Sequence, residues 1–237
     1  MIHRHRRHAS LTAAAAALLL LLVGAVIAVA GGASHGQPAA SLPPGTLAPL
    51  TSLGRLTPPG PAGPPGPEGV PVPNAPELAS SEPRQAGSPV DGIECQVAEQ
   101  VLFHIHAHLT VFVGGAARRI PDGIGIPAAQ VSPTPAGPFV SAGACFYWLH
   151  THAADGIIHI ESPIERTYTL GDFFDVWGQR LGRTEVGRVG GRVTAFDDGR
   201  LFRGNPREIP LSKHAEIQLD VGRPLVAPVA VSFPPGL

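Results

Sequence analysis

The stretch LFHIHAHLTVFV, Leu102–Val113, alternates strictly between apolar and polar side chains. Branched and aromatic residues occupy one set of alternate positions, while His104, His106, His108 and Thr110 occupy the other. A period of two predicts a β-strand with one buried face and one polar face. The three histidines are therefore expected to project from the same face of one strand.

Turn signals on either side of apolar runs predict two hairpins. Gly114-Gly115 turns the chain from this strand into Ala116–Ile120, which indicates the first hairpin. Cys145–His152 and Ile157–Glu161 flank a turn that contains Asp155-Gly156, which indicates the second. Each turn should set its two flanking strands side by side and antiparallel.

One helix is expected after the second hairpin. Thr169 and Asp172 have the spacing of a capping box, which marks a helix start. The apolar residues that follow recur on one helical face: Leu170, Phe173, Phe174 and Trp177. Gly178 comes directly afterwards and predicts the end of the helix.

The remaining elements complete the expected fold. Arg192–Phe196 and Arg200–Arg203 flank Asp197-Asp198-Gly199 and predict a third hairpin, and Glu216–Val221 alternates as a last strand. Residues 121–143 are rich in Pro, Gly and Ala and are expected to form a long loop. This order predicts an α+β fold, with a small mixed or antiparallel β-sheet and one main helix laid across it.

The second hairpin brings further metal-binding residue types together. His150 and His152 share a face of one strand, and His159 and Glu161 share a face of the other. A two-residue Asp155-Gly156 turn would set His152 opposite His159, whereas a four-residue turn would set His150 opposite His159. Both registers keep all four side chains on one face, with opposed Cβ atoms about 5 Å apart.

This pattern predicts a transition-metal site. Neutral imidazole suits zinc, copper, iron or nickel, and a carboxylate can complete a ligand set. Because Met1 is the only methionine, a thioether-based Cu(I) site is excluded, and we expect Cu(II) or Zn(II). The candidate ligands are His104, His106, His108, His150, His152, His159 and Glu161. The alternative is a polar or pH-responsive sheet face without metal, and His214 is a further, loop-borne candidate.

The two cysteines are Cys95 and Cys145. Cys145 lies five residues before His150 and is itself a candidate thiolate ligand, but strand parity points it away from that histidine. Two cysteines in an oxidising compartment usually pair. We therefore favour a disulfide between them.

The N-terminal region predicts export and a membrane anchor. Residues 1–10 are a basic flank, and residues 11–30 are an uncharged apolar run long enough to span a bilayer as a helix. The basic flank should stay in the cytoplasm, which leaves the C-terminal domain extracytoplasmic, periplasmic or at the cell surface. Ala28-Val29-Ala30 also fits a signal-peptidase site, so cleavage is the alternative to a single-pass anchor.

Between the anchor and the domain lies a stretch of unusual composition. Residues 31–89 hold fifteen of the 27 prolines and show no hydrophobic periodicity, which predicts a disordered Pro/Gly-rich stalk. The folded domain is then expected to span residues 90–237. The net charge of −1 and the lack of a dense basic surface argue against a nucleic-acid partner.

Three motifs carry a resemblance to known proteins: HIHAH at 104–108, CFYWLHTHAADGIIHIESP at 145–163 and TLGDFFDVWG at 169–178. They resemble an uncharacterised family of exported, often membrane-anchored, His-rich bacterial and archaeal proteins. The resemblance covers most of Asp91–Leu237. It implies a shared fold and histidine pattern and carries no activity or cofactor.

The second half of the chain is also similar in pattern to the small β-grasp sulfur carriers of thiamine and molybdopterin synthesis. Those proteins act through a C-terminal Gly-Gly, whereas this chain ends Pro234-Pro235-Gly236-Leu237. The resemblance therefore implies a β-grasp-like fold and no shared function.

Three classes of function remain. We favour a membrane-tethered metal-binding domain that acts as a chaperone, buffer or sensor. A metal-dependent enzyme needs an open coordination position and a general base, for which Glu161 and Asp155 are the nearest acids. We rank it lower because the chain has no nucleophile elbow, phosphate loop or His-Glu-x-x-His motif. The third class is an adhesion or assembly module on a stalk.

Overall fold

The computed structural model describes residues 45–82 and 86–237. The predicted basic flank (1–10) and membrane span (11–30) lie outside the described residues. Within the described ranges, no helix has the length and apolar character needed to cross a bilayer.

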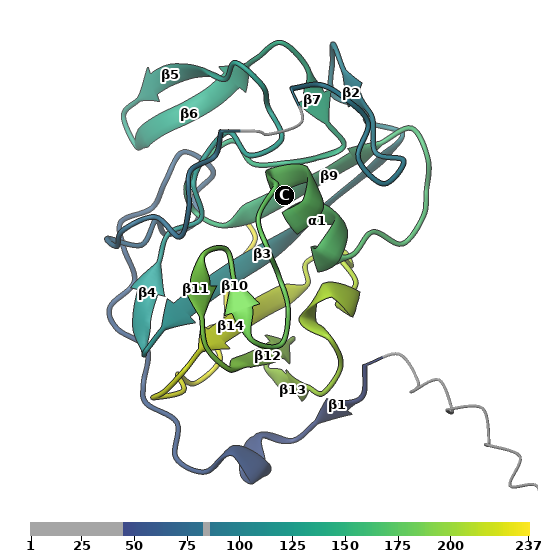
Figure 1. Ribbon diagram of the computed structural model, residues 1–237. Coiled ribbons are helices and arrows are strands. Elements are labelled where there is room, and N and C mark those ends of the chain that lie inside the picture. The colour runs from purple at the N-terminus through teal and green to yellow at the C-terminus, as the bar shows by residue number, and fades with distance from the viewer. Residues whose placement is uncertain (1–44, 83–85) are drawn as a thin grey trace, which may run out of the picture. The chain divides into compact units, whose positions relative to one another are not determined.

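One mixed β-sheet forms the centre of the fold (Figure 1). Its strands, from one edge to the other, are β1 (Leu47–Ala48), β13 (Arg200–Phe202), β12 (Val193–Asp197), β14 (Glu216–Val221), β3 (Phe103–Val113), β9 (Ile157–Ser162) and β8 (Leu149–His150), and β4 (Ala116–Arg118) pairs with β3. β14 runs parallel to β3, and the other neighbours in this sheet pair antiparallel. The long strands β3 and β14 thus lie side by side and parallel at the centre of the sheet.

The only α-helix of the described residues, α1 (Leu170–Trp177), lies against this sheet (Figure 1). Thr169 and Asp172 form the predicted capping box, and Gly178 ends the helix in the left-handed conformation with a φ of 68°. The apolar face of α1 packs into the main core with the alternate positions of β3, β9 and β14, including Leu109, Ile160 and Leu219. The predicted α+β fold is therefore confirmed.

Two tight turns set the hairpins as their sequences predict. Val113 pairs with Ala116 around Gly114-Gly115, and Asp197 pairs with Arg200 around Asp198-Gly199. All four turn residues have positive φ, which matches the right-handed twist of the flanking strands.

Residues 121–143 contain more structure than the predicted loop. They include a two-stranded ribbon of β5 (Gln130–Thr134) and β6 (Gly137–Ala142), apart from the main sheet. Pro133 lies opposite Pro138 in this ribbon, so neither donates a ladder hydrogen bond there. An isolated ribbon tolerates such prolines, which is why composition alone suggested a loop.

The remaining elements are short. They are η1 (Leu50–Leu53), η2 (Pro206–Glu208), the pair β2 (Cys95–Gln96) with β7 (Phe146–Tyr147), and the pair β10 (Glu185–Val186) with β11 (Val189–Gly190). The predicted disulfide is confirmed, because Cys95 and Cys145 are bonded with their Cα atoms 5.4 Å apart. It fastens the β2–β7 pair at the end of the sheet where β8 begins.

The Pro-rich segment 45–82 differs from the predicted disordered stalk, of which 31–44 and 83–85 lie outside the described residues. This segment packs along the domain: β1 pairs with β13, and Thr57 N donates to Leu225 O at 2.9 Å. Val70 and Leu78 are buried, and Trp177 Nε1 donates to Ser80 O at 2.8 Å. Because proline has a fixed φ, ordering such a segment costs little entropy, and a few contacts suffice.

Removing the segment should destabilise the domain. We expect a chain of residues 86–237 to unfold with a free energy about 3–6 kcal/mol lower than a chain of residues 45–237. The reason is that burying Val70 and Leu78 contributes about 1.5–3 kcal/mol each. Urea denaturation followed by tryptophan fluorescence measures this difference, and identical unfolding curves would show that the segment does not belong to the fold.

Candidate metal centre

The position of β9 between β3 and β8 brings the predicted ligands together. His159 on β9 pairs with His106 on one side and with His150 on the other. One pair further along, His104 lies opposite Glu161. The His150–His159 pairing is the register of the four-residue turn, so three strands present a row of imidazoles on the face opposite α1.

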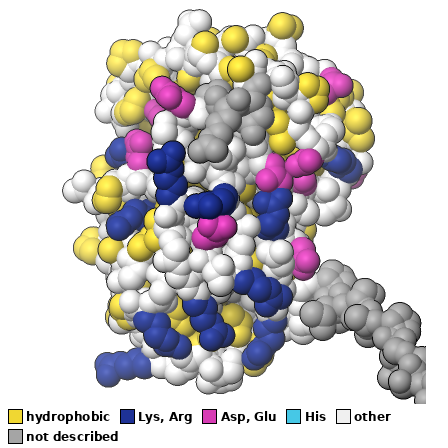
Figure 2. Space-filling view, in the orientation of Figure 1, with side chains coloured by type: hydrophobic (Ala, Val, Ile, Leu, Met, Phe, Trp, Pro, Cys, Tyr) yellow, Lys and Arg dark blue, Asp and Glu magenta, His cyan; other side chains and the backbone are white. Residues whose placement is uncertain are grey.

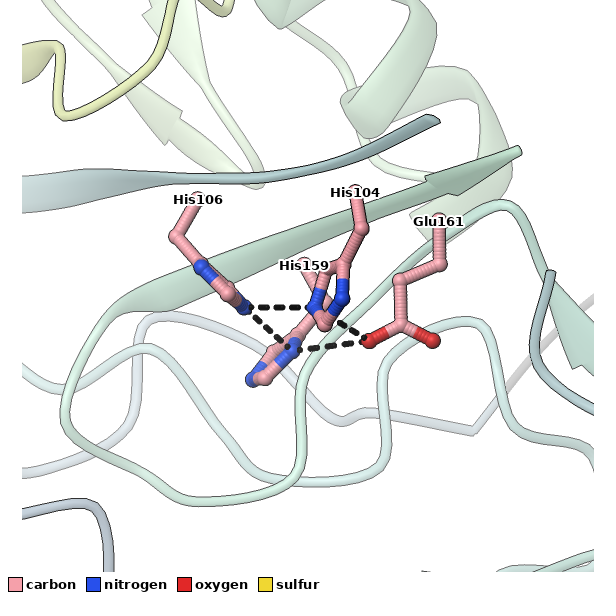
Figure 3. A group of neighbouring side chains, drawn as sticks. All are labelled: His104, His106, His159 and Glu161. Carbon is pink, nitrogen blue, oxygen red and sulfur yellow. Dashed lines mark hydrogen bonds and ion pairs between the residues drawn. The ribbon is translucent and has the colours of Figure 1, made fainter. Parts of the chain in front are cut away.

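A first group consists of His104, His106, His159 and Glu161 (Figure 3). His106 Nε2 lies 3.1 Å from both His104 Nε2 and His159 Nδ1. Glu161 Oε1 lies 3.1 Å from His104 Nε2 and 3.3 Å from His159 Nδ1. Tetrahedral bonds of about 2.0–2.1 Å place ligand atoms about 3.3 Å apart, so these distances match the edges of a zinc-sized site.

A second group consists of His150, His152, His159 and Glu161. His150 Nδ1 donates to Tyr147 O at 2.8 Å, and His152 Nδ1 donates to Val140 O at 2.6 Å. A neutral imidazole with its hydrogen on Nδ1 carries a lone pair on Nε2. The two Nε2 atoms face each other at 3.1 Å, so two lone pairs point at one another.

Burial keeps most of these imidazoles neutral. It lowers the pKa of His106 to about 3 and the pKa of His150 well below its ordinary value, with further lowering by the neighbouring His159. The pKa of His152 is lowered for the same reasons. At neutral pH these two rings therefore lack the extra proton that could form a hydrogen bond between them. Their facing lone pairs repel each other unless a cation lies between them.

His159 is the exception. Burial disfavours its charged form, but hydrogen bonds and charges from Glu161 and Glu68 outweigh this and raise its pKa to about 9. Its Nε2–H donates to Glu68 Oε1 at 2.7 Å, and its Nδ1 faces Glu161 Oε1. In metal sites, a carboxylate often accepts a hydrogen bond from the histidine nitrogen that does not bind the metal. This bond orients the ring and raises its basicity.

Two carboxylates at the site were not predicted. Glu68 comes from the Pro-rich segment and is buried against His159, and Glu99 Oε1 lies 3.4 Å from His152 Nε2. The sequence offered one signal for the first, because Glu68 is the only charged residue between Arg55 and Glu77. No local pattern marks Glu99.

Among the described residues, the carboxylates of the site form no ion pair with a Lys or Arg side chain. Within the described ranges, every ion pair of Glu68, Glu99 and Glu161 is made with a histidine. Glu68 Oε2 and Glu161 Oε2 are buried without a hydrogen-bond partner. Buried charges are ordinarily paired or bound to metal, so this cluster is suited to a cation.

His108 and His214 lie apart from both groups. His108 Nε2 donates to Asp155 O at 2.8 Å, which ties β3 to the turn before β9. Burial lowers its pKa to about 4. His214 is exposed and its Nε2 donates to Leu237 O at 2.9 Å. The structure therefore brings together six of the seven predicted ligands and gives His108 a backbone partner instead.

On the face shown in Figure 2 no histidine is visible, and acidic and basic side chains are interspersed there. Five of the six clustered ligands are buried, and His104 is the most accessible, with 37% of its side chain exposed. An ion would therefore reach the site past His104.

Comparison of the chain with family models, curated proteins and solved structures yields no match.

A variant at His108 tests whether this side chain stabilises the fold or binds the metal. We expect His108→Gln to lower the free energy of unfolding by about 1–3 kcal/mol, because a buried hydrogen bond to the turn is lost or weakened. Metal content per chain should stay unchanged, in contrast to His106→Gln on the same strand face. Urea denaturation and elemental analysis measure the two effects, and loss of metal from His108→Gln would place this histidine among the ligands.

Proposed function

We propose that this chain is an exported, membrane-tethered protein whose folded domain binds a divalent transition metal, Cu(II) or Zn(II). The facing lone pairs of His150 and His152 carry the proposal. Each Nδ1 is committed to a backbone carbonyl, so neither ring can turn its hydrogen toward the other without losing that bond. A metal ion between them resolves the repulsion and uses both lone pairs.

The donor set supports these two ions. Imidazole and carboxylate suit Cu(II) and Zn(II), and neither a thiolate nor a thioether is at hand. Both cysteines are consumed in the disulfide, and Met1 is the only methionine of the chain. Soft ions such as Cu(I) are therefore disfavoured.

The surroundings of the site support holding an ion rather than catalysis. A catalytic zinc keeps one coordination position open for water or substrate. Here the protein itself supplies a surplus of donors, and most of them are buried. We infer a role as a metal chaperone, buffer or sensor.

The location follows from the N-terminal sequence. The basic flank 1–10 and the apolar run 11–30 support a single-pass anchor with the domain outside the cytoplasm. The Cys95–Cys145 disulfide agrees with an oxidising compartment. The inferred partners are the membrane and the metal ion.

Metal content tests the proposal on the full chain without a histidine tag. His3, His5, His8 and His35 lie outside the described residues and can bind metal themselves, so they are replaced by alanine to give the background chain. We expect the background chain to retain at least one ion per chain after desalting. Removing the ion should lower the free energy of unfolding of this chain. The loss is about 2.7 kcal/mol when the comparison is with the same chain in free metal at one hundred times Kd.

The matched comparison is His150→Ala/His152→Ala against His214→Ala, both in the background chain. The double variant should lose the ion held between these two rings and the stabilisation that this ion gives, and His214→Ala should keep both because its ring contacts the C-terminal backbone. Equal melting of the background chain in chelator, zinc and copper would contradict the proposal. An adhesion or acid-sensing role would then explain the histidine face better.

A further inference from the structure

We propose that the site holds two metal ions bridged by Glu161; this rests on the proposed function and specifies its stoichiometry. The two four-residue groups share His159 and Glu161. The distinct members are His104 and His106 in one group and His150 and His152 in the other. With Glu68 and Glu99, the cluster offers five imidazoles and three carboxylates. One first-row ion usually takes about four to six donors, which leaves this set too large for one.

The two histidine pairs approach from opposite sides of β9. His104 and His106 project from β3, and His150 and His152 lie on and just after β8, with β9 between the two strands. Within each pair the two Nε2 atoms are 3.1 Å apart. We call each pair of facing nitrogen atoms a clamp. The strand β9 lies between the two strands that carry the clamps.

Glu161 connects the two clamps through its two oxygens. Oε1 lies 3.1 Å from His104 Nε2 and 3.3 Å from His159 Nδ1. Oε2 is buried without a hydrogen bond, and its ion-pair partner is His150 Nε2 at 4.0 Å. A bridging carboxylate gives one oxygen to each ion, and ions in two-metal sites lie about 3.5–4 Å apart. Oε2, which has no hydrogen bond, is the atom that a single ion in the first group would leave unused.

His159 belongs to the first ion. Its Nε2–H donates to Glu68 Oε1 at 2.7 Å, which leaves Nδ1 as the nitrogen that faces His106 and Glu161. The first ion then takes His104, His106, His159 and Glu161 Oε1. Glu68 acts as a positioning residue, because it orients the ring of His159 from behind.

The second ion takes the remaining donors. His150 Nε2, His152 Nε2 and Glu161 Oε2 face one another, and Glu99 Oε1 lies 3.4 Å from His152 Nε2. Glu99 therefore completes a second set of four. Two divalent cations also offset the three carboxylates of the cluster, for which the described residues supply no Lys or Arg ion pair.

Copper stoichiometry and electron paramagnetic resonance of the full-length background chain test the inference. We expect two Cu(II) per chain after equilibrium dialysis, with a signal broadened or reduced by magnetic coupling. His104→Ala/His106→Ala and His150→Ala/His152→Ala should each retain one ion, which gives the full signal of an isolated Cu(II). Far-UV circular dichroism before and after loading checks that each variant is folded.

A single substitution at Glu99 tests the two-metal inference even if the double variants unfold. Glu99 is partly exposed, so Glu99→Gln should leave the fold intact and weaken binding of the second ion at least tenfold. Binding of the first ion should not change, and the isolated signal should appear at one equivalent of copper. His214→Gln is the matched surface control and should bind both ions as before.

The outcomes separate this inference from the proposed function. One ion per chain in the background chain overturns the two-metal centre and leaves the proposed metal binding standing. Two ions with a fully uncoupled signal overturn the Glu161 bridge. No bound ion overturns both.

Discussion

The pairing of β9 with β3 on one side and β8 on the other is the constraint on which the site depends. It sets His159 opposite His106 and His150, and it sets Glu161 opposite His104. Because side chains alternate along a strand, a register shift of one residue in either strand pairing would turn the histidine and glutamate side chains toward the apolar core. The packing of Ile158 and Ile160 against the α1 side of the sheet guards against that slip. The core therefore fixes which face carries the histidine cluster.

The polar face carries an energetic cost that the apolar face must offset. Burying Glu68 and Glu161 among imidazoles removes carboxylate charge from water without a Lys or Arg partner in the described part of the chain. Binding of a cation would offset this cost. The disulfide and the packed Pro-rich segment hold the surrounding backbone in place, and with it the side chains of the cluster.

Much of this fold could be predicted from local chemistry. Turn residues such as Asp198-Gly199 and the capping box of Thr169 act over a few residues, and they placed the hairpins and the helix. Strand parity likewise placed the histidines on common faces. The pairing of β9 with β3 and the contact of Glu68 with His159 depend on segments far apart in the chain, and no local pattern encodes them. His108 was grouped with its strand neighbours because parity cannot show that Asp155 O occupies its ring nitrogen.

X-ray absorption spectroscopy of the metal-loaded background chain tests the central claim most directly, because it reports which atoms bind the ion. The account predicts nitrogen and oxygen ligands at about 2.0 Å, the outer-shell scattering of several imidazoles, and no sulfur. These features should diminish in His150→Ala/His152→Ala. A shell of oxygen alone, or a sulfur ligand at about 2.3 Å, would contradict the assignment of the histidine cluster as the metal site.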